Sequence, residues 1–233
     1  MAPHERVRDR VRLSDRNQQC GVSSRDPKDF WVVRAHDGRG FMWAFPDDLT
    51  LSDGRSEPLP LAERWAVARG DLTGLASPPR FVIDRPGKPG DLVWTANMLK
   101  VAPSRFLDVL SDVGASGWDS HPVEIIDRHG EVLDGFHLLA VVGETDESTL
   151  NYDPATVNAM YDDAWEVSGF DVTVGWDGSD VFWIGGRAGS SFLATDEVAR
   201  ALTAAGLSGF ERTRATEHVA QINPQLMGPR GTA

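Results

Sequence analysis

Val101-Ala-Pro-Ser-Arg-Phe-Leu-Asp-Val-Leu-Ser-Asp-Val-Gly-Ala-Ser-Gly-Trp118 is the stretch of sequence that decides the fold. Four of its apolar residues follow the spacing i, i+3, i+4, i+7, which places them on one face of a helix: Phe106, Val109, Leu110 and Val113. Pro103 suits the first turn of this helix, and Gly114 suits the left-handed residue after its last turn. The stretch therefore predicts an apolar strand, a helix over about 103–113, a Gly-x-Ser-Gly turn and a return through an aromatic residue.

The same pattern returns 92 residues further along the chain. Gly206-Leu-Ser-Gly-Phe210 repeats Gly114-Ala-Ser-Gly-Trp118, and the residues before it repeat the helical spacing: Val198, Ala201, Leu202 and Ala205. Thr195 is the N-cap candidate for a helix that we expect over about 196–205. Two copies of Gly-x-Ser-Gly behind a helix predict a duplicated unit, with generic strand and helix packing as the alternative.

Other runs of sequence predict hairpins and isolated elements. Three pairs of strand-like runs are separated by turn residues: 30–35 with 41–45, 123–126 with 132–133, and 170–174 with 181–184. The continuous apolar run over 136–142 is typical of a central strand. Three further elements are expected: a short helix over 61–68, a strand over 81–83 and a helix over 155–165.

Together these elements predict an α+β fold (mixed α/β) with antiparallel-rich sheets, hairpins and two similar strand–helix–strand units. With 233 residues, 41% of them hydrophobic, the chain is long enough to bury a sizeable core. Four segments are expected: a flexible Arg-rich extension over 1–28, a β-rich N-terminal subdomain over 29–90, an α/β C-terminal domain over 91–218 and a tail over 219–233.

The bulk composition predicts a bacterial cytoplasmic protein. The sequence has no run of about 18 apolar residues that could cross a membrane. Its N-terminus carries Arg without the apolar stretch of a secretory signal. Cys20 is the single cysteine, which excludes a disulfide framework and an all-cysteine metal site.

Negative charge is concentrated in one central segment. The chain has 35 acidic and 23 basic residues, for a net charge of −12. Residues 129–186 contain no Lys or Arg and hold twelve acids: Glu131, Asp134, Glu144, Asp146, Glu147, Asp153, Asp162, Asp163, Glu166, Asp171, Asp177 and Asp180. The other 35 − 12 = 23 acids balance the 23 bases. This distribution would repel nucleic acids and anionic membranes and attract a basic protein, with a solvated acidic face as the alternative.

We expect the acidic segment to bind the partner. The candidate partner-binding residues are Glu144, Asp146, Glu147, Asp153, Asp162, Asp163, Trp165, Glu166, Trp176 and Asp177. Trp165 and Trp176 would be the anchors, because Trp at the centre of an interface contributes strongly to affinity. Core packing is the competing interpretation for both.

The sequence presents no complete catalytic or metal-binding motif. Ser116 and Ser208 follow helices rather than the strand that a nucleophile elbow requires, and no His-x-x-x-His or Cys-x-x-Cys pair occurs. We therefore expect no enzyme activity, no cofactor and no metal. The alternative is a small hydrolase that uses His and Asp, because His121, His129 and His137 recur every eight residues around a predicted hairpin.

Several motifs in the second half resemble bacterial families. Four runs are similar to a segment of the double-CXXCG proteins: Val101–Leu110, Gly114–Trp118, His121–Glu124 and Gly130–Gly143. Three runs resemble the end of the related immunity-protein-eleven family: Val181–Ile184, Ser191–Thr195 and Ala201–Phe210. The resemblance covers roughly residues 91–214, with a gap over the acidic segment.

The resemblance implies an immunity protein that binds and neutralises a cognate toxin of a polymorphic toxin system by occlusion. The acidic segment would then face a basic toxin, such as a nuclease that holds a phosphate backbone. One departure is plain: the double-CXXCG proteins carry paired cysteines in their N-terminal part, whereas this chain has only Cys20. A zinc site of that kind is therefore not expected, and residues 1–90 are not explained by the resemblance.

Overall fold

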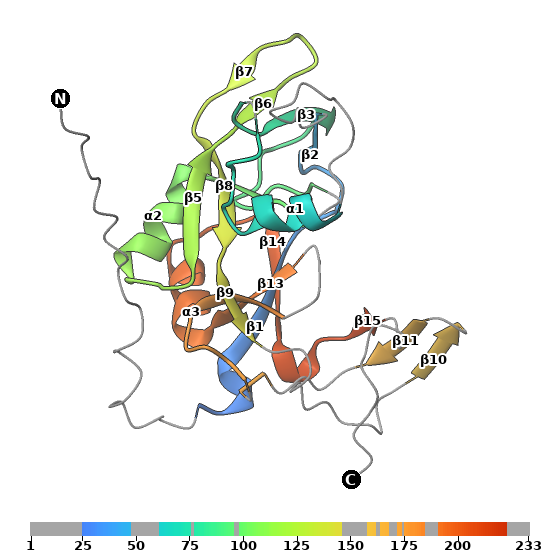
Figure 1. Cartoon of the computed structure of the whole chain (residues 1–233), viewed down its shortest axis with the longest axis vertical. Coiled ribbons are helices and arrows are strands. Elements are labelled where there is room, and N and C mark those ends of the chain that lie inside the picture. The colour runs from blue at the N-terminus through green and yellow to red at the C-terminus, as the bar shows by residue number, and fades with distance from the viewer. Residues whose placement is uncertain are drawn as a thin grey trace, which may run out of the picture.

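The computed structural model describes residues 25–47, 61–75, 77–95, 98–145, 158–161, 164–167, 172–173, 175–184 and 191–222. The elements follow one another in this order: η1 (Pro27–Asp29), β1 (Phe30–Ala35), β2 (Trp43–Pro46), α1 (Leu61–Ala68), β3 (Arg80–Arg85), β4 (Lys100–Pro103), α2 (Ser104–Asp112), β5 (Trp118–Pro122), β6 (Glu124–Ile126), β7 (Val132–Leu133), β8 (Phe136–Val141), β9 (Gly143–Thr145), β10 (Asn158–Tyr161), β11 (Ala164–Val167), β12 (Val181–Ile184), β13 (Ser191–Thr195), α3 (Asp196–Ala204), β14 (Phe210–Arg214), η4 (Ala215–Glu217) and β15 (Ala220–Ile222). Helices α2 and α3 pack together on one flank, and the β6–β7 hairpin projects at one end (Figure 1). The expected α+β fold with antiparallel-rich sheets is confirmed.

The two predicted strand–helix–strand units are present and superimpose in sequence. Helix α3 begins and ends 92 residues after α2, and β14 begins and ends 92 residues after β5. The glycines after the helices share their left-handed backbone, with φ of 64° at Gly114 and 66° at Gly206. The second glycine of each turn does so as well, with φ of 85° at Gly117 and 83° at Gly209. Equal spacing and equal backbone angles confirm the two similar units.

The middle strand of each unit comes from elsewhere in the chain. Strand β8 lies antiparallel between β4 and β5, and β1 lies antiparallel between β13 and β14. His137 of β8 is paired with Ala102 and Pro122, and Trp31 of β1 is paired with residues 194 and 214, which lie 92 positions further on. The two sheets therefore share one register as well as one topology.

The equivalent strands show that the chain consists of two halves that exchange their first strands. The first half runs β1, β2, β4, α2, β5, and the second runs β8, β9, β13, α3, β14. Each half completes the sheet of the other, because β1 belongs to the sheet of the second half and β8 to the sheet of the first. The second strands correspond too: β9 lies parallel to β12, and Trp43 of β2 forms a parallel bridge with Trp94.

This exchange explains why one predicted hairpin is wrong. Strands β1 and β2 were expected to pair with each other, but they lie in different sheets. The Gly-containing turn between them reverses the chain, yet both edges of β1 are already occupied by β13 and β14. The predicted hairpin that includes β12 is also wrong, because β9 and β13 occupy both edges of β12. Part of its first strand, at 170–171 and 174, lies outside the described residues.

Other predicted elements divide between confirmed and corrected. Helix α1 occupies the expected 61–68, β3 covers the expected strand, β6 and β7 form the expected hairpin, and β8 is a central strand. The helix predicted over 155–165 is wrong: β10 and β11 form an antiparallel pair there, and β15 adds to β11. Short apolar runs satisfy helical and strand spacing alike, so a distant partner strand such as β15 decides the outcome.

Thr195 occupies the expected N-cap of α3, and Pro103 occupies the N-cap of α2 instead of its first turn. Both residues are extended, and neither caps its helix with a side-chain hydrogen bond. Instead the Thr195 hydroxyl donates to Oδ1 of Asp180 at 3.1 Å. Thr195 thus ties the start of α3 to the segment before β12.

The two halves share one hydrophobic core. Its buried side chains include Phe106 of the first half, Leu138 and Phe192 of the second half, and Phe81 of β3. Burial of side chains of this size stabilises the fold by about 1.5–3 kcal/mol each. None of the described helices has the length and apolarity needed to span a lipid bilayer.

A lysine side chain, Lys100, is buried beside this core. Lys100 is 2% exposed, its ammonium group donates to the carbonyl of Met98 at 2.7 Å, and it lies 4.7 Å from the ring centroid of Trp183. Burial lowers the pKa of Lys100 well below its ordinary value. The position 92 residues later is Phe192, so the fold itself does not require a charge here.

Candidate functional site

Half of the predicted partner-binding residues can be placed. Asp146, Glu147, Asp153, Asp162 and Asp163 lie outside the described residues. Trp165 and Glu166 lie on β11, which pairs with β10 on one edge and β15 on the other. Glu144, Trp176 and Asp177 are described with their side chains, and they lie close together around β9.

These three residues make contacts within the chain. Arg69 of the loop after α1 donates to Glu144, with both side chains a little over a third exposed. Asp177 accepts backbone hydrogen bonds from Glu144 and Ser179, each at 2.9 Å. Arg69 offsets the charge of Glu144, and the carboxylate of Asp177 stabilises a turn. Both acids therefore have structural roles that the sequence did not reveal.

Trp176 is half-buried and packs against Phe30 of the five-stranded sheet β14-β1-β13-β12-β9. Its ring centroid lies 5.0 Å from that of Phe30 in an edge-on arrangement, and its indole N–H donates to the carbonyl of Ser179 at 2.8 Å. The guanidinium carbon of Arg25 lies 5.3 Å from the same ring. The packing interpretation of Trp176 therefore has direct support, while a role as a partner anchor stays a prediction.

The three histidines of the alternative hypothesis do not converge. His121 on β5 is paired with Leu138, and His137 on β8 is paired with Pro122, so their side chains point to opposite faces of the sheet. His129 is exposed in the β6–β7 turn. The nearest carboxylate to His121 is Asp119, at 3.9 Å, which is beyond hydrogen-bonding distance.

Among the described residues, one Ser–His pair approaches the geometry of a nucleophile and base. The Oγ atom of Ser104, the first residue of α2, lies 3.0 Å from Nε2 of His137. At the equivalent place in the other half, the indole N–H of Trp31 donates to Asp196 at 2.8 Å. Both contacts join the exchanged strand to the first turn of a helix, which indicates that they stabilise the fold.

Three potential cation ligands meet where β1 ends beside β14. One ligand atom each from His36, Asp37 and Glu211 lies within 4.8 Å of the others. However, Arg34 donates twice to one carboxylate oxygen of Glu211, at 2.8 and 2.5 Å, and the Gly38 N–H donates to Nδ1 of His36 at 2.9 Å. These internal partners occupy one carboxylate oxygen of Glu211 and Nδ1 of His36, so both side chains have structural roles.

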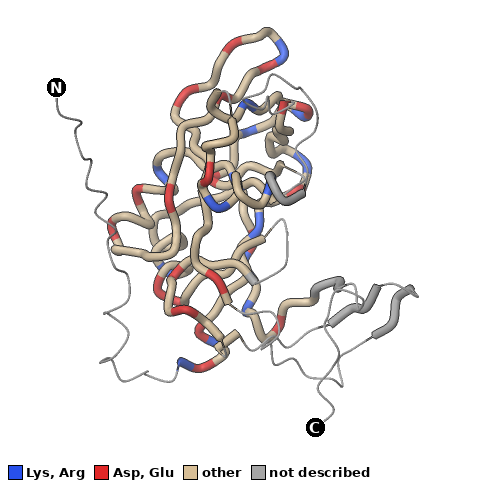
Figure 2. Tube along the Cα trace, in the orientation of Figure 1, with Lys and Arg blue, Asp and Glu red and all other residues tan. Residues whose placement is uncertain are grey.

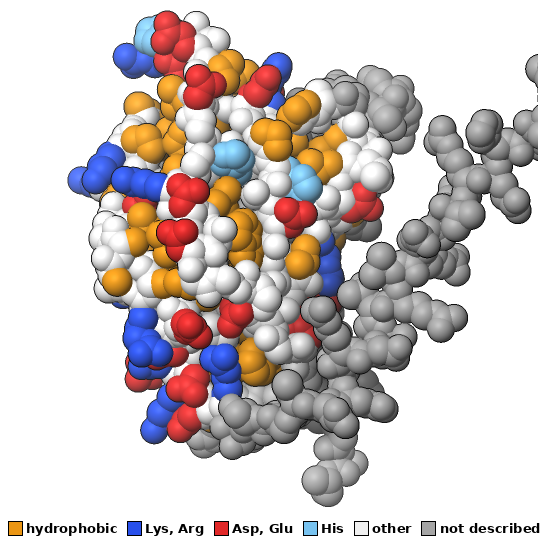
Figure 3. All heavy atoms as spheres, turned by 90° about the vertical axis from the view of Figure 1, so that its left-hand side faces the viewer, with side chains coloured by type: hydrophobic (Ala, Val, Ile, Leu, Met, Phe, Trp, Pro, Cys, Tyr) orange, Lys and Arg blue, Asp and Glu red, His pale blue; other side chains and the backbone are white. Residues whose placement is uncertain are grey.

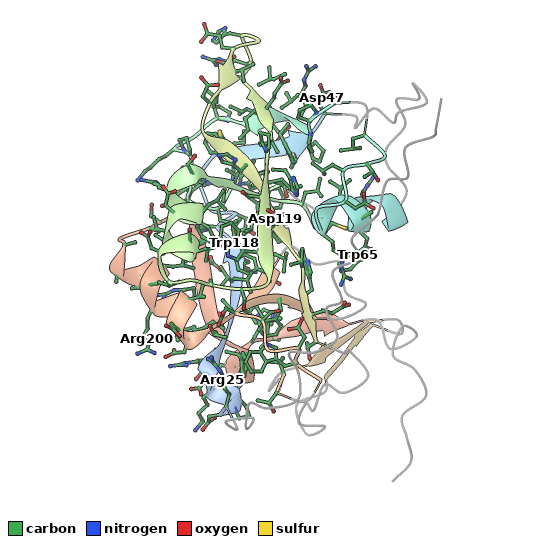
Figure 4. All side chains as sticks on the ribbon, turned by 60° about the vertical axis from the view of Figure 1, so that its left-hand side comes forward. Arg25, Asp47, Trp65, Trp118, Asp119 and Arg200 are labelled. Atoms are coloured by element: carbon green, nitrogen blue, oxygen red, sulfur yellow. The ribbon has the colours of Figure 1, made fainter. Side chains whose placement is uncertain are left out.

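One group of solvent-accessible acids lies on and beside the four-stranded sheet β2-β3-β6-β7. Five carboxylates form what we call the acidic end: Asp47, Asp84, Glu124, Glu131 and Asp134. Asp47 marks this end of the molecule, whereas Trp118 and Asp119 lie midway along the body and Arg25 and Arg200 at the opposite end (Figure 4). The acidic residues line the projecting hairpin and the neighbouring strands (Figure 2).

Three arginines lie among these acids. Arg80 forms an ion pair of 3.1 Å with Glu124, Arg85 at the end of β3 covers the ring of Trp43, and Arg128 lies in the exposed turn of the hairpin. The other four acids make no ion pair with any described residue. Asp127, below the turn, accepts backbone hydrogen bonds that lower its pKa, first from Glu131 and then from His129, so it stays ionised at neutral pH. Acidic residues therefore outnumber arginines at this end.

Sequence reasoning found only part of the acidic end. Glu131 and Asp134 belong to the predicted acidic segment, but Asp47, Asp84 and Glu124 come from other parts of the chain. They join through the parallel pairing of β3 with β6. Parallel pairing leaves no local turn signal, so no sequence pattern pointed to this cluster.

Neither a protein-family model nor a curated protein sequence matches the chain. The resemblance over residues 91–214 stays a prediction.

Proposed function

We propose that the chain is a protein-binding inhibitor, an immunity protein that holds a basic toxin and occludes it. The acidic end is the observation that carries this proposal. Its five solvent-accessible carboxylates lie on or beside one sheet, which also carries Arg80, paired with Glu124, Arg85, which covers Trp43, and Arg128 in the hairpin turn. An excess of acidic residues speeds the encounter with a basic protein and disfavours nucleic acids and anionic membranes.

The contacts of the described residues favour binding over catalysis. The three histidines of the hydrolase alternative lie apart, and the Ser104–His137 contact has a structural counterpart in Trp31–Asp196. Among the described residues, no carboxylate bonds to the ring of His137 to orient it as a base. A basic protein ligand needs none of this machinery.

The partner is best sought in the product of the neighbouring reading frame. The tagged chain and an inactivated form of that product are purified separately, and binding is followed by surface plasmon resonance at several salt concentrations. We expect a tight complex whose association rate falls steeply with ionic strength, because exposed charges steer the encounter and salt screens them. Absence of a complex at every salt concentration would overturn the proposal.

A charge-reversal pair tests the acidic end directly. Glu131→Lys with Asp134→Lys should lower the association rate by about tenfold or more, since steering can raise on-rates by 10 to 10³. The matched control reverses Asp108 and Asp112, two exposed acids on α2, away from the acidic end. Equal losses in the two variants would show that net charge, and not this end of the molecule, attracts the partner.

A further inference from the structure

The acidic end surrounds a row of apolar side chains on the outer face of its sheet. Phe45 is paired with Val82, Val82 with Ile126, and Ile126 with Val132, so one row crosses all four strands. Directly paired residues point to the same face of a sheet. We call this row, with its four residues, the outer row.

The opposite face of the same strands is buried in the core. Phe81, Ile125 and Ala44 are each 0% exposed. A sheet that covers the core with one face normally turns polar side chains to the solvent with the other. The outer row departs from that pattern, because Val82 remains 37% and Val132 49% exposed.

Half-buried aromatic rings lie at the β2 end of the outer row, where Trp94 also packs against the hydrophobic core. The rings of Trp43 and Trp94 lie 4.2 Å apart between centroids, and Phe45 lies 5.8 Å from Trp94. Arg85 covers Trp43, with its guanidinium carbon 3.2 Å from the ring centroid. Trp and Arg are the residue types that most often dominate binding energy at protein interfaces.

Apolar residues inside a charged rim are the anatomy of a protein interface. Interface centres are depleted in charge, while their rims are polar and exposed. Here the rim consists of the acidic end, and acidic and hydrophobic side chains stand beside one another at that end of the molecule (Figure 3). An occupant that matches both parts must have an apolar patch bordered by Lys or Arg.

We infer that the outer row is the docking surface for the basic protein partner, with the acidic end as its rim. This inference rests on the proposed function and adds the location of the contact. It assigns different tasks to the two sets of residues. The rim acids govern the rate of association, and the outer row governs how long the complex lasts, because apolar contacts form only after docking.

Val→Thr substitutions test the outer row without changing side-chain shape or branching. Val82→Thr with Val132→Thr places two hydroxyl groups where the partner would bury methyl groups. Val142→Thr is the matched control, since Val142 is 44% exposed and lies beyond β8, outside the acidic end. Thr keeps the strand preference of Val, so both the double variant and the control are expected to fold, which thermal unfolding verifies.

The readout is the pair of rate constants for binding to the product of the neighbouring reading frame. We expect the double variant to dissociate at least tenfold faster with an unchanged association rate, and the control to match the wild type within twofold. If the wild type binds and the double variant dissociates no faster than the control, the docking surface is wrong while the proposed function stands. If the wild-type chain forms no complex, both the docking surface and the proposed function are contradicted.

Discussion

The carboxylate of Asp180 accepts hydrogen bonds from both the backbone N–H and the hydroxyl of Ser116, at 3.0 and 2.9 Å. The two residues are 64 positions apart and belong to different halves of the chain. Asp91 makes the reciprocal contact with the backbone N–H of Ser208, at 2.5 Å. Each Gly-x-Ser-Gly turn is thus held by an aspartate that precedes the opposite unit.

Removal of this link should weaken the fold. Asp180→Ala leaves Ser116 and the Thr195 hydroxyl without their acceptor, and we expect the free energy of unfolding to fall by about 2–3 kcal/mol. Chemical denaturation measures it. Asp112→Ala is the control, because Asp112 is exposed on α2 and its loss should cost less than about 0.5 kcal/mol. Equal costs for the two substitutions would contradict the linking role.

Two glycines with similar backbone angles should respond differently to alanine. A Cβ atom at Gly117 would collide with the carbonyl oxygen of Val181, whereas one at Gly114 would meet nothing within 4 Å. We expect Gly114→Ala to cost about 1 kcal/mol for its left-handed backbone and Gly117→Ala about 3 kcal/mol or more. Thermal unfolding of both variants decides the point, and similar melting temperatures would refute the close approach of the two halves.

Lys100 should make the stability depend on alkaline pH. Burial lowers its pKa in the folded state, so the unfolded chain binds more protons between that lowered value and about 10.4, the ordinary pKa of Lys. The free energy of unfolding should therefore rise with pH across this window, by at most about 1.4 kcal/mol per pH unit.

The Lys100→Met variant isolates this contribution. Met lacks the titrating group, so the stability of the variant relative to the wild type should be greatest at the acidic side of the window and shrink as the pH approaches 10. Urea denaturation at a series of pH values gives the comparison. A difference between variant and wild type that stays constant with pH would show that Lys100 keeps its proton in the folded state.

The ties between exchanged strands and helices should differ in strength. Asp196 accepts from Trp31 at 2.8 Å and also pairs with Arg200 and Arg214, whereas Ser104 meets only His137 and the carbonyl of Gly135. We expect Asp196→Ala to cost about 1–3 kcal/mol and Ser104→Ala less than about 1 kcal/mol. Denaturant midpoints at equal slope provide the measurement, and a larger loss for Ser104→Ala would reverse this ranking.

The sequence predicted local structure well and long-range pairing poorly. Helices α2 and α3 were predictable because spacing, N-terminal residues and left-handed glycines act within one segment. The partners of β1 were not, because the turn at Gly38 and Gly40 reports only that the chain reverses. Nothing local states that β13 and β14 will occupy both edges of β1.

The candidate site was predictable to a similar degree. The charge block pointed to a basic partner, but it did not show that Glu144 is held by Arg69 or that Asp180 binds Ser116. Conversely, the outer row depends on the parallel pairing of Val82 with Ile126, which no local pattern encodes. Composition predicts the sign of the surface charge, and only the sheet topology shows which residues lie on the same surface.

The exchange of first strands also sets the order in which the protein can mature on the ribosome. Strand β1 emerges early, yet its partner β14 lies far downstream, as the bond from Arg34 to Glu211 across 177 residues shows. At translation rates of about 5–20 residues per second, β1 waits roughly 10–35 seconds with both edges unpaired. The nascent chain therefore exposes the apolar strand over residues 30–35 until β13 and β14 have been synthesised.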